Sequence, residues 1–464
     1  MRNNTFGLSD LRTLTTSHKR NASSFGGVGG GGEEGYEALS TSRRLSSRRR
    51  GGIMSTTTLN LVRIVKWTLG TIVAFVIIFF WKYELHIELQ LYNRNWIQST
   101  ILPISPTSSH CFSRSHITSS TLYNLSLSES PKFIDFHSGM NLPLGTDCYS
   151  FASTLPQTPI RGMELPEMTT IHLYWRNDLL PLGERQLKLI ESILFTQSEK
   201  HTKVIFWTNA KDPKREIETL PILQPVLKQF GGGEQKRFEI KKVDKKELSL
   251  KTPMESSPYL ELADTQAWVD GDLVRLLVLY QYGGVWIDFD TVLTGKRDLR
   301  VLLEHEWVTQ WDCYDKIYQP LNGAMMHFFQ NSPYLCEMLY TMSISPPPNK
   351  NSIDWGSRLY HKTYRSLINS GIKPFKILPF CFTDGVSCRL DNRLPDPFEE
   401  TSVREKKKWG KGRWEQVKWK LENVWAVHLH NRWDKDFPKG GYIVEMVLKP
   451  IEEKKRLMGY RDQL

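Results

Sequence analysis

Asp288 and Asp290 stand one residue apart, directly after a short apolar run. In an extended segment, residues i and i+2 share a face, so both carboxylates can point toward one place while Phe289 turns into the core. Two carboxylates together with phosphate oxygens make the hard, all-oxygen environment that Mg²⁺ or Mn²⁺ prefers. The spacing therefore predicts a divalent-cation site that holds a diphosphate and neutralises the charge that develops when a bond to it breaks.

An Asp-x-Asp sequence by itself occurs by chance in many proteins, so the residues before this pair are needed to judge whether it forms a functional site. The segment Thr265–Tyr282 places apolar residues at helical spacing. Gly283 and Gly284 follow it, where they end the helix and let the chain turn sharply while keeping backbone clear of a ligand. The alternative, a solvated acidic pair at the end of a strand, explains none of this context.

Three apolar segments upstream predict the strands of a sheet behind this site. Between the first two, Gly183–Thr196 has the pattern of an amphipathic helix. Strands that alternate with helices favour an α/β fold with a mostly parallel sheet covered on both faces. Ligands of such folds bind at the carboxyl ends of strands, so we expect Trp175, Thr208 and Asn209 at the same edge as Asp288. The three segments are Thr170–Trp175, Lys203–Thr208 and Arg237–Val243.

An uncharged apolar segment near the N-terminus, Trp67–Trp81, predicts a single membrane span. It is shorter than the about 20 residues that usually cross a bilayer, but snorkelling of Lys66 and Lys82 and apolar neighbours extend it. Basic residues precede the segment, so the N-terminus should face the cytosol. We expect a disordered basic cytosolic tail over residues 1–60 and a signal-anchor helix over residues 61–82. A buried helix of a soluble protein is the alternative.

The distribution of charge and of cysteine fits this division. The formal net charge is +11, of which residues 1–66 supply +7 with 11 Lys/Arg against 4 Asp/Glu. The rest of the chain is only mildly basic, so we expect no nucleic-acid partner. All six cysteines follow the apolar segment, which suits disulfides in an oxidising lumen, with buried free thiols as the alternative. They are Cys111, Cys148, Cys313, Cys336, Cys381 and Cys388.

The remaining chain divides by composition. Residues 83–165 are rich in Ser, Thr and Pro with weak periodicity, which predicts a stem, and residues 166–464 form the expected lumenal catalytic domain. Within that domain, Glu405–Lys420 mixes cations with tryptophans spaced five residues apart, which share no helical face. A solvated insertion anchored by aromatic residues is favoured there over a surface that contacts an acceptor or anionic lipid.

The stretch Asp270–Val292 resembles the sugar-binding, DXD-containing region of glycosyltransferase family 32, with its α-1,4- and α-1,6-glycosyltransferase members of the fungal Golgi type. That family's pattern is an acidic residue and an arginine on a helix, then Tyr-Gly-Gly, an apolar strand and Asp-x-Asp. A weaker resemblance extends over roughly Thr169–Asp434 and includes Val427–Asn431. The residues that match the pattern are Asp272, Arg275, Tyr282, Gly283, Gly284, Asp288 and Asp290.

The resemblance implies a GT-A-like nucleotide-diphosphosugar transferase fold and a metal-dependent hexosyltransferase that retains anomeric configuration. Asp288 and Asp290 would be the catalytic pair that holds Mn²⁺ or Mg²⁺ with the donor's ribose or diphosphate, and His428 would be a further metal ligand. Asp272 and Arg275 would contact the donor sugar or order the site. A plain ion pair between these last two, three residues apart on a helix, is the structural alternative.

The acceptor side of the site differs most from the family pattern. Asn322, Asp354 and Trp355 are the acceptor-side candidates, and His430 stands where relatives often carry tryptophan. A double-displacement mechanism needs a carboxylate beside the anomeric carbon, for which Asp354 and Asp384 are candidates. The resemblance favours same-face attack instead, in which the departing phosphate helps to deprotonate the acceptor.

These features predict a type II, single-pass Golgi membrane enzyme. It would move a hexose, mannose or galactose, from a donor of the GDP-mannose or UDP-galactose class to a glycan or glycolipid acceptor. Two alternatives stay open. One is a catalytically inactive relative that serves as a lectin-like or partner subunit of a glycosylation complex, and the other is a membrane-tethered adaptor that acts through residues 1–52.

Overall fold

The computed structural model describes residues 56–83, 91–101, 104–107, 109–119, 122–136, 147–233, 236–311, 320–386, 394–399 and 403–459. The chain divides into two compact units, Met1–Ile97 and Gln98–Leu464. Most of the expected cytosolic tail lies outside the described residues, as do parts of the expected stem and the cysteines Cys313 and Cys388.

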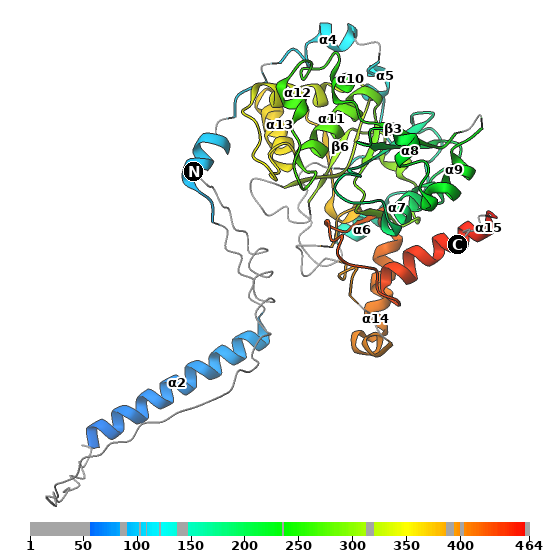
Figure 1. The fold of residues 1–464 in the computed structure, drawn as a ribbon. Helices are drawn as coiled ribbons and strands as arrows, with labels where there is room; N and C mark the ends of the chain where they lie inside the picture. The colour runs from blue at the N-terminus through cyan, green and yellow to red at the C-terminus, as the bar shows by residue number, and fades with distance from the viewer. Residues whose placement is uncertain are drawn as a thin grey trace, which may run out of the picture. The chain divides into compact units, whose positions relative to one another are not determined.

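The N-terminal unit is built on one long helix, α2 (Thr56–Lys82), drawn in blue in Figure 1. Its stretch Arg63–Lys82 has a mean hydropathy of 2.1, and none of it is buried in the structure. Twenty residues at 1.5 Å each extend about 30 Å, which is the thickness of the hydrocarbon core of a bilayer. The unit therefore contains a helix that is long and apolar enough to cross a membrane. Shorter helices follow at α3 (Arg94–Trp96) and η1 (Ile97–Ile101).

The second unit is organised around a seven-stranded sheet with the strand order β3-β2-β1-β4-β7-β6-β8. The pairs β3–β2, β2–β1, β1–β4 and β6–β8 are parallel, while β7 runs antiparallel to both β4 and β6. The expected α/β class with a mostly parallel sheet is confirmed. The strands are β1 (Thr169–Trp175), β2 (Thr202–Thr208), β3 (Phe238–Lys242), β4 (Gly284–Ile287), β6 (Trp307–Gln310), β7 (Leu321–Phe328) and β8 (Lys376–Leu378).

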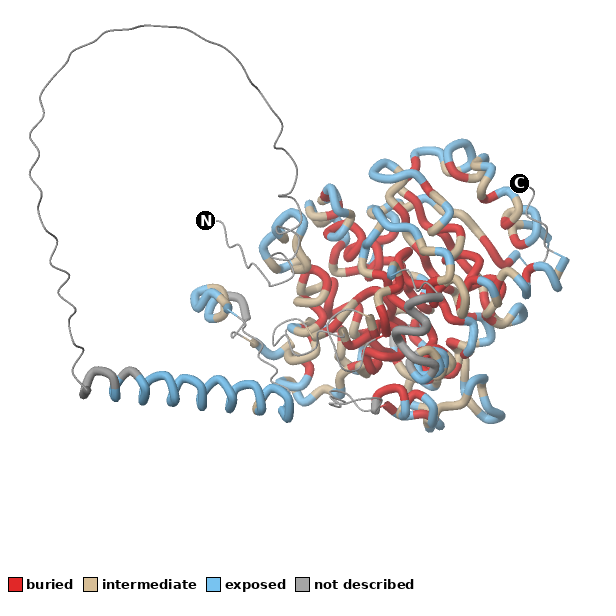
Figure 2. Tube along the Cα trace, turned by 90° about the horizontal axis from the view of Figure 1, so that it is seen from below, coloured by how far each residue is buried: buried red, intermediate tan, exposed pale blue. Residues whose placement is uncertain are grey.

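Alternation along the strands divides the hydrophobic core into two layers, one on each face of the sheet. Val204 and Phe206 of β2 pack on the side of helix α7 (Glu184–Leu194). Ile205 and Trp207 of the same strand pack on the side of α11 (Val269–Tyr282). Helices α12 (Pro333–Ile344) and α13 (Ser357–Asn369) join α11 on that second face. Figure 2 shows the buried part of the trace concentrated inside this unit, whereas the described part of α2 is mostly exposed.

Helix α11 begins later than the sequence pattern suggests. The Asp264 carboxylate accepts hydrogen bonds from the backbone N–H groups of Trp268 and Val269, at 2.9 and 3.1 Å. Ala267, just before, has a φ of 56°, so the preceding chain is a turn and not a first helical turn. At the other end, Gly283 with a φ of 62° terminates the helix as expected.

A second, two-stranded sheet brings the C-terminal region beside the end of β4. It pairs β5 (Thr291–Leu293) with β9 (Ala426–His428) in antiparallel register, so that Thr291 lies opposite His428. Helix α14 (Val403–Glu422) leads into β9, and its Trp414 and Trp419 pack against the core. This packing agrees with the expectation that the aromatic residues of Glu405–Lys420 anchor the segment.

Two disulfides tie part of the expected stem into the second unit. Cys111 pairs with Cys336 of α12, and Cys148 of helix α6 (Asp147–Thr154) pairs with Cys381 of η5 (Phe380–Phe382). The compact unit therefore includes much of the segment before residue 166. The other helical segments are α4 (Arg114–Ser119), α5 (Leu125–Glu129), α8 (Pro213–Glu216), η2 (Pro221–Leu223), α9 (Gln224–Phe230), α10 (Lys245–Ser249), η3 (Pro258–Glu261), η4 (Leu299–Leu302), η6 (Val444–Leu448) and α15 (Lys449–Leu457).

Candidate active site

A cavity of about 610 Å³ opens where β1 and β4 end and β9 approaches. Trp175 lies at the end of β1, Asp288 and Asp290 follow β4, and His428 ends β9; all four line the cavity. Its position at the carboxyl ends of parallel strands is where α/β sheets bind their ligands. The volume lies in the range of small-molecule sites.

The Arg275 guanidinium organises one wall of this cavity. Its Nη2 donates to both carboxylate oxygens of Asp288, at 2.9 and 3.0 Å. Its Nη1 donates to Asp272 Oδ1 at 2.8 Å and to the hydroxyl of Tyr360 at 2.9 Å. Trp286 Nε1 adds a 2.6 Å hydrogen bond to Asp288 Oδ1. Charge-assisted, bidentate bonds of this kind fix a carboxylate in one orientation, so Asp288 is held ready on the cavity wall.

Two glycines make room for this arginine network. A Cβ on Gly323 would overlap Nη1 of Arg275 and lie 2.8 Å from the Tyr360 hydroxyl. A Cβ on Gly356 would lie 2.7 Å from Asp272 Oδ2. The two positions therefore require glycine because of the close approach of side chains, since neither has a positive φ.

Asp290 belongs to a second network on the opposite side of the motif. Its Oδ2 lies 3.2 Å from His428 Nε2 and accepts a 2.6 Å hydrogen bond from the backbone N–H of Asn431. The other ring nitrogen of His428, Nδ1, lies 3.1 Å from Asp384 Oδ1. The sequence placed His428 near the motif, and the β5–β9 pairing accounts for that placement.

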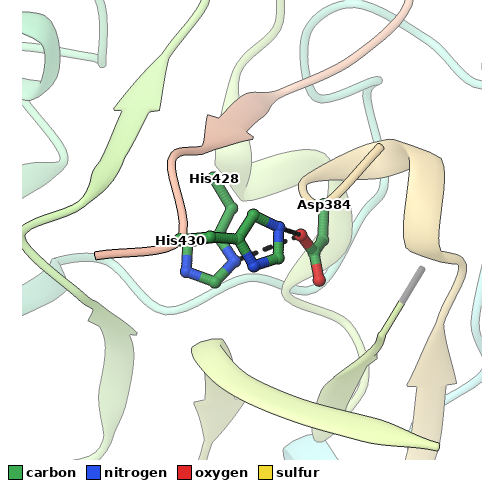
Figure 3. A group of neighbouring side chains, drawn as sticks. All are labelled: Asp384, His428 and His430. Carbon is green, nitrogen blue, oxygen red and sulfur yellow. Dashed lines mark hydrogen bonds and ion pairs between the residues drawn. The ribbon is translucent and has the colours of Figure 1, made fainter. Parts of the chain in front are cut away.

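His430 joins Asp384 and His428, and Figure 3 shows these three side chains in close-up. Its Nε2 lies 2.7 Å from the same Asp384 oxygen, and its ring stands 4.1 Å from that of His428, centroid to centroid. Both His430 and Asn431 have a φ of 55°, a left-handed conformation that non-glycine residues adopt at a cost. This turn directs the Asn431 N–H at Asp290.

Burial and neighbouring charges shift the pKa values of Asp290 and His428 in opposite directions. Burial by itself would raise the pKa of Asp290, but the charge and hydrogen bond of His428 together with the Asn431 N–H outweigh it and bring that pKa to about 2. Burial likewise lowers the pKa of His428, yet Asp290 and Asp384 together raise it well above its usual value. Without a cation His428 is therefore an imidazolium between two carboxylates. On the other wall, burial raises the pKa of Asp272 to about 7 although Arg275 opposes the shift.

The local geometry of the Asp-x-Asp pair differs from the extended segment assumed from the sequence. The backbone N–H of Thr291 donates to the carbonyl of Asp288, so residues 288–291 form a turn. The two carboxylates still line one cavity, but Asp288 is held by Arg275 and Asp290 by the His428 side. Phe289 turns into the core as expected, and is 4% exposed.

The other donor-side candidates fall into two groups. Trp175, Asp272 and Arg275 line the cavity. Thr208 and Asn209 are not among its lining residues; Thr208 is fully buried, and the Asn209 side chain accepts the backbone N–H of Asn177 at 3.0 Å.

Gly283 and Gly284 act through the backbone. Their φ values are 62° and 97°, and a Cβ on either would press on a neighbouring main chain, Gln330 or Thr170. These two glycines thus shape the turn into β4 and are absent from the cavity lining.

The acceptor-side candidates are also divided. Asn322 lines the cavity and donates to Asp384 Oδ2 at 2.9 Å. Trp355 is 3% exposed and packs in the core layer of α11. The Asp354 carboxylate is engaged by Arg358 and by the Ser352 hydroxyl, at 2.5 and 2.9 Å, and does not line the cavity.

The sequence alone did not reveal how Asp384 and Tyr360 serve the site. The sequence suggests Asp384 only as a possible nucleophile and gives no reason to single out Tyr360. They contact His428 and Arg275 from 44 and 85 positions away in the chain, so spacing offered no signal. Only the folded chain brings them to the motif.

The donor atoms around the cavity fit a divalent cation such as Mn²⁺. Asp288 and Asp290 would supply carboxylate oxygens and His428 an imidazole, and all three residues line the same cavity. Among the described residues, the group whose ligand atoms all lie within 4.8 Å of one another is Asp384, His428 and His430. Carboxylates with imidazole are an accepted ligand set for Mn²⁺ and neighbouring transition metals.

Comparison with known proteins agrees with this geometry. Residues 183–309 match the family model described as the glycosyltransferase sugar-binding region containing a DXD motif, a range that includes Asp288 and Asp290. A stretch of 70 residues is 40% identical to an uncharacterized protein of Arabidopsis thaliana and covers 15% of this chain and 10% of that relative. The family match supports a glycosyltransferase domain.

Similar solved structures are distant in sequence. A PaToxG glycosyltransferase has a TM-score of 0.31 and 15% identity, over 48% of this chain and 73% of its own. The bifunctional glycosyltransferase WbbM, in an apo structure, has a TM-score of 0.36 and 9% identity, over 65% of this chain and 52% of its own. Both TM-scores lie well below 0.5, so neither structure indicates a function for this chain.

Proposed function

We propose that this chain is a divalent-metal-dependent glycosyltransferase that moves a hexose from a nucleotide-sugar to a glycan or glycolipid hydroxyl. The observation that carries the proposal is that Asp288, Asp290 and His428 line one cavity at the carboxyl edge of the sheet. The family match over residues 183–309 supports it independently. Donors of the GDP-mannose or UDP-galactose class are the substrates proposed.

Each residue of the site would have a separate role in holding the cation and the donor diphosphate. Asp288, Asp290 and His428 would hold the cation, which would supply positive charge to the leaving diphosphate. Arg275 fixes Asp288 with a bidentate hydrogen bond, and the Asn431 N–H fixes Asp290. Because these partners hold both carboxylates before a ligand arrives, little reorganisation is needed when charge develops.

The proposed stereochemical course is retention by same-face attack. A double displacement needs a free carboxylate beside the anomeric carbon. Asp384 is 1% exposed and contacts two histidines, while Asp354 is engaged by Arg358 and does not line the cavity. The two sequence candidates for a nucleophile are therefore both occupied by other partners, which favours the mechanism that needs none.

The proposed setting is the lumen of the Golgi, with α2 as a type II signal anchor. The exposed apolar helix and the basic residues before it support a cytosolic N-terminus. The disulfides Cys111–Cys336 and Cys148–Cys381 support an oxidising compartment.

Donor turnover by the detergent-solubilised full chain tests this proposal. A panel of UDP- and GDP-sugars is incubated with Mn²⁺, with Mg²⁺ or with a chelator, and released nucleotide is measured. We expect hydrolysis of one donor that needs the cation and falls about 100-fold or more in Asp288→Asn, because a ligand to the metal is lost. Asp354→Asn is the matched control, as its carboxylate lies off the cavity.

Two outcomes would count against the proposal in different ways. Failure of every donor in the panel to bind would remove the transferase assignment. Donor binding without turnover, unchanged in Asp288→Asn, would favour the lectin-like or partner-subunit alternative instead.

A further inference from the structure

His428 is held between two buried carboxylates that contact different ring nitrogens. Nε2 lies 3.2 Å from Asp290 Oδ2, and Nδ1 lies 3.1 Å from Asp384 Oδ1. Asp290 and His428 line the cavity, whereas Asp384 does not. One ring nitrogen therefore contacts a carboxylate that lines the cavity, and the other contacts a carboxylate that does not.

Asp384 is itself fixed from several sides. Its Oδ2 accepts the Asn322 amide at 2.9 Å, and its Oδ1 is shared by His428 and His430. The backbone N–H of His428 donates to the carbonyl of Thr383 at 3.0 Å, which locks the two segments together. With 1% of its surface exposed, Asp384 cannot turn to solvent and must satisfy its charge within this cluster.

We propose that Asp384 is a positioning residue that accepts the Nδ1–H of His428 and so leaves Nε2 to ligate the cation held by Asp290. The inference rests on the function proposed above and adds a residue to it. Metal-ligating histidines characteristically donate their other ring N–H to a carboxylate or carbonyl, which fixes the tautomer and the ring orientation. The path Asp290–His428–Asp384, visible in part in Figure 3, has that form.

A cation bound directly by Asp384, His428 and His430 is the competing arrangement, since their ligand atoms lie within 4.8 Å of one another. In that arrangement Nδ1 of His428 is the ring nitrogen beside Asp384, at 3.1 Å. The Asn322 amide, whose oxygen accepts the Ala324 N–H, donates to Asp384 Oδ2 at 2.9 Å and so holds this carboxylate beside Nδ1. The Asn322 nitrogen also lies 3.2 Å from Nδ1, and in the proposed state this is a packing contact, because both nitrogens then carry hydrogen. Nε2 lies beside Asp290, a carboxylate that lines the cavity, which favours Nε2 as the ligand.

Binding of Mn²⁺ alone to the full chain in detergent, followed by electron paramagnetic resonance of the free ion, tests the proposal without any donor turnover. We expect Asp384→Asn to weaken Mn²⁺ binding about 10- to 100-fold, the usual effect of losing a carboxylate behind a ligating histidine. His430→Gln removes the neighbouring imidazole and one of the contacts to Asp384, so it should weaken Mn²⁺ binding by a smaller factor than Asp384→Asn does. Equal losses in the two variants would instead place the cation on Asp384 and His430 and overturn the proposal.

A milder variant keeps the test decisive if Asp384→Asn does not fold. Asn322→Ala removes only the amide that orients Asp384 and should weaken Mn²⁺ binding by a smaller factor in the same direction. Wild-type Mn²⁺ affinity in either folded variant would refute the role of Asp384. Absence of Mn²⁺ binding in the wild-type chain would instead refute the proposed function, so the two failures can be told apart.

Discussion

Adding one methyl group at Gly323 should damage the site, although such a change within a strand ordinarily stabilises a protein. Alanine is favoured over glycine in a strand interior by about 0.5–1 kcal/mol, because glycine loses more conformational freedom on folding. At this position, however, a Cβ would overlap Nη1 of Arg275, so the guanidinium must move. A loss of stability in Gly323→Ala would therefore show that the hydrogen bonds of Arg275 are disturbed, whereas a gain would show that they are not.

The magnitude follows from the bonds that Nη1 makes. It donates to Asp272 at 2.8 Å and to Tyr360 at 2.9 Å, and hydrogen bonds to charged groups contribute about 1.5–3 kcal/mol each. Losing one or both predicts that Gly323→Ala lowers the free energy of unfolding by about 2–5 kcal/mol. Displacement of Arg275 would also release Asp288 and reduce donor hydrolysis.

Urea unfolding followed by tryptophan fluorescence measures this change. Gly271→Ala is the matched control, because Gly271 also lines the cavity but a Cβ there would meet nothing within 4 Å. It lies within α11 and should raise stability by up to about 1 kcal/mol through helix propensity. Equal stability of Gly323→Ala and wild type, or a loss of similar size in both variants, would refute the reasoning.

Two further predictions concern regions away from the cavity. Replacing both Cys148 and Cys381 by serine should lower the free energy of unfolding by about 2–5 kcal/mol, because the disulfide closes a loop of 233 residues. Urea unfolding without reductant compares this variant with the wild type, and an unchanged free energy of unfolding would contradict the expectation. Burial raises the pKa of Glu306 from 4.5 to about 7, so the native state holds this proton more tightly than the unfolded chain does. The resulting stability is complete below pH 4.5 and is lost as the pH rises through about 7. Glu306→Gln should remove about 2.5 kcal/mol of that pH dependence between pH 5 and pH 8 in urea unfolding, and an unchanged slope would show that Glu306 does not titrate in this range.

The sequence predicted the parts of the fold that depend on local patterns. Strands β1 and β2 lie within one residue of the expected apolar runs, because buried parallel strands are continuous apolar segments bounded by polar turns. The position of Gly283 at the end of α11 was predictable for a similar reason, since a positive φ at a helix end favours glycine.

Features that depend on tertiary packing could not be predicted in this way. The antiparallel strand β7, inserted between β4 and β6, has no sequence signal that sets its direction. The pairing of Cys111 with Cys336 was one of several possibilities and draws part of the expected stem into the compact unit. The contact between Asp384 and His428 spans 44 positions of the chain and arises only when β9 pairs with β5.

The proposed transferase requires the Asp-x-Asp motif and His428 to hold one divalent cation together. Anomalous diffraction at the manganese edge, from crystals grown with Mn²⁺ and a nucleoside diphosphate, tests it most directly. We expect a single strong peak in the cavity, ligated by Asp288, Asp290 and Nε2 of His428, with the diphosphate bound to the ion. A peak elsewhere on the protein, or a nucleotide bound in the cavity without a cation, would contradict it.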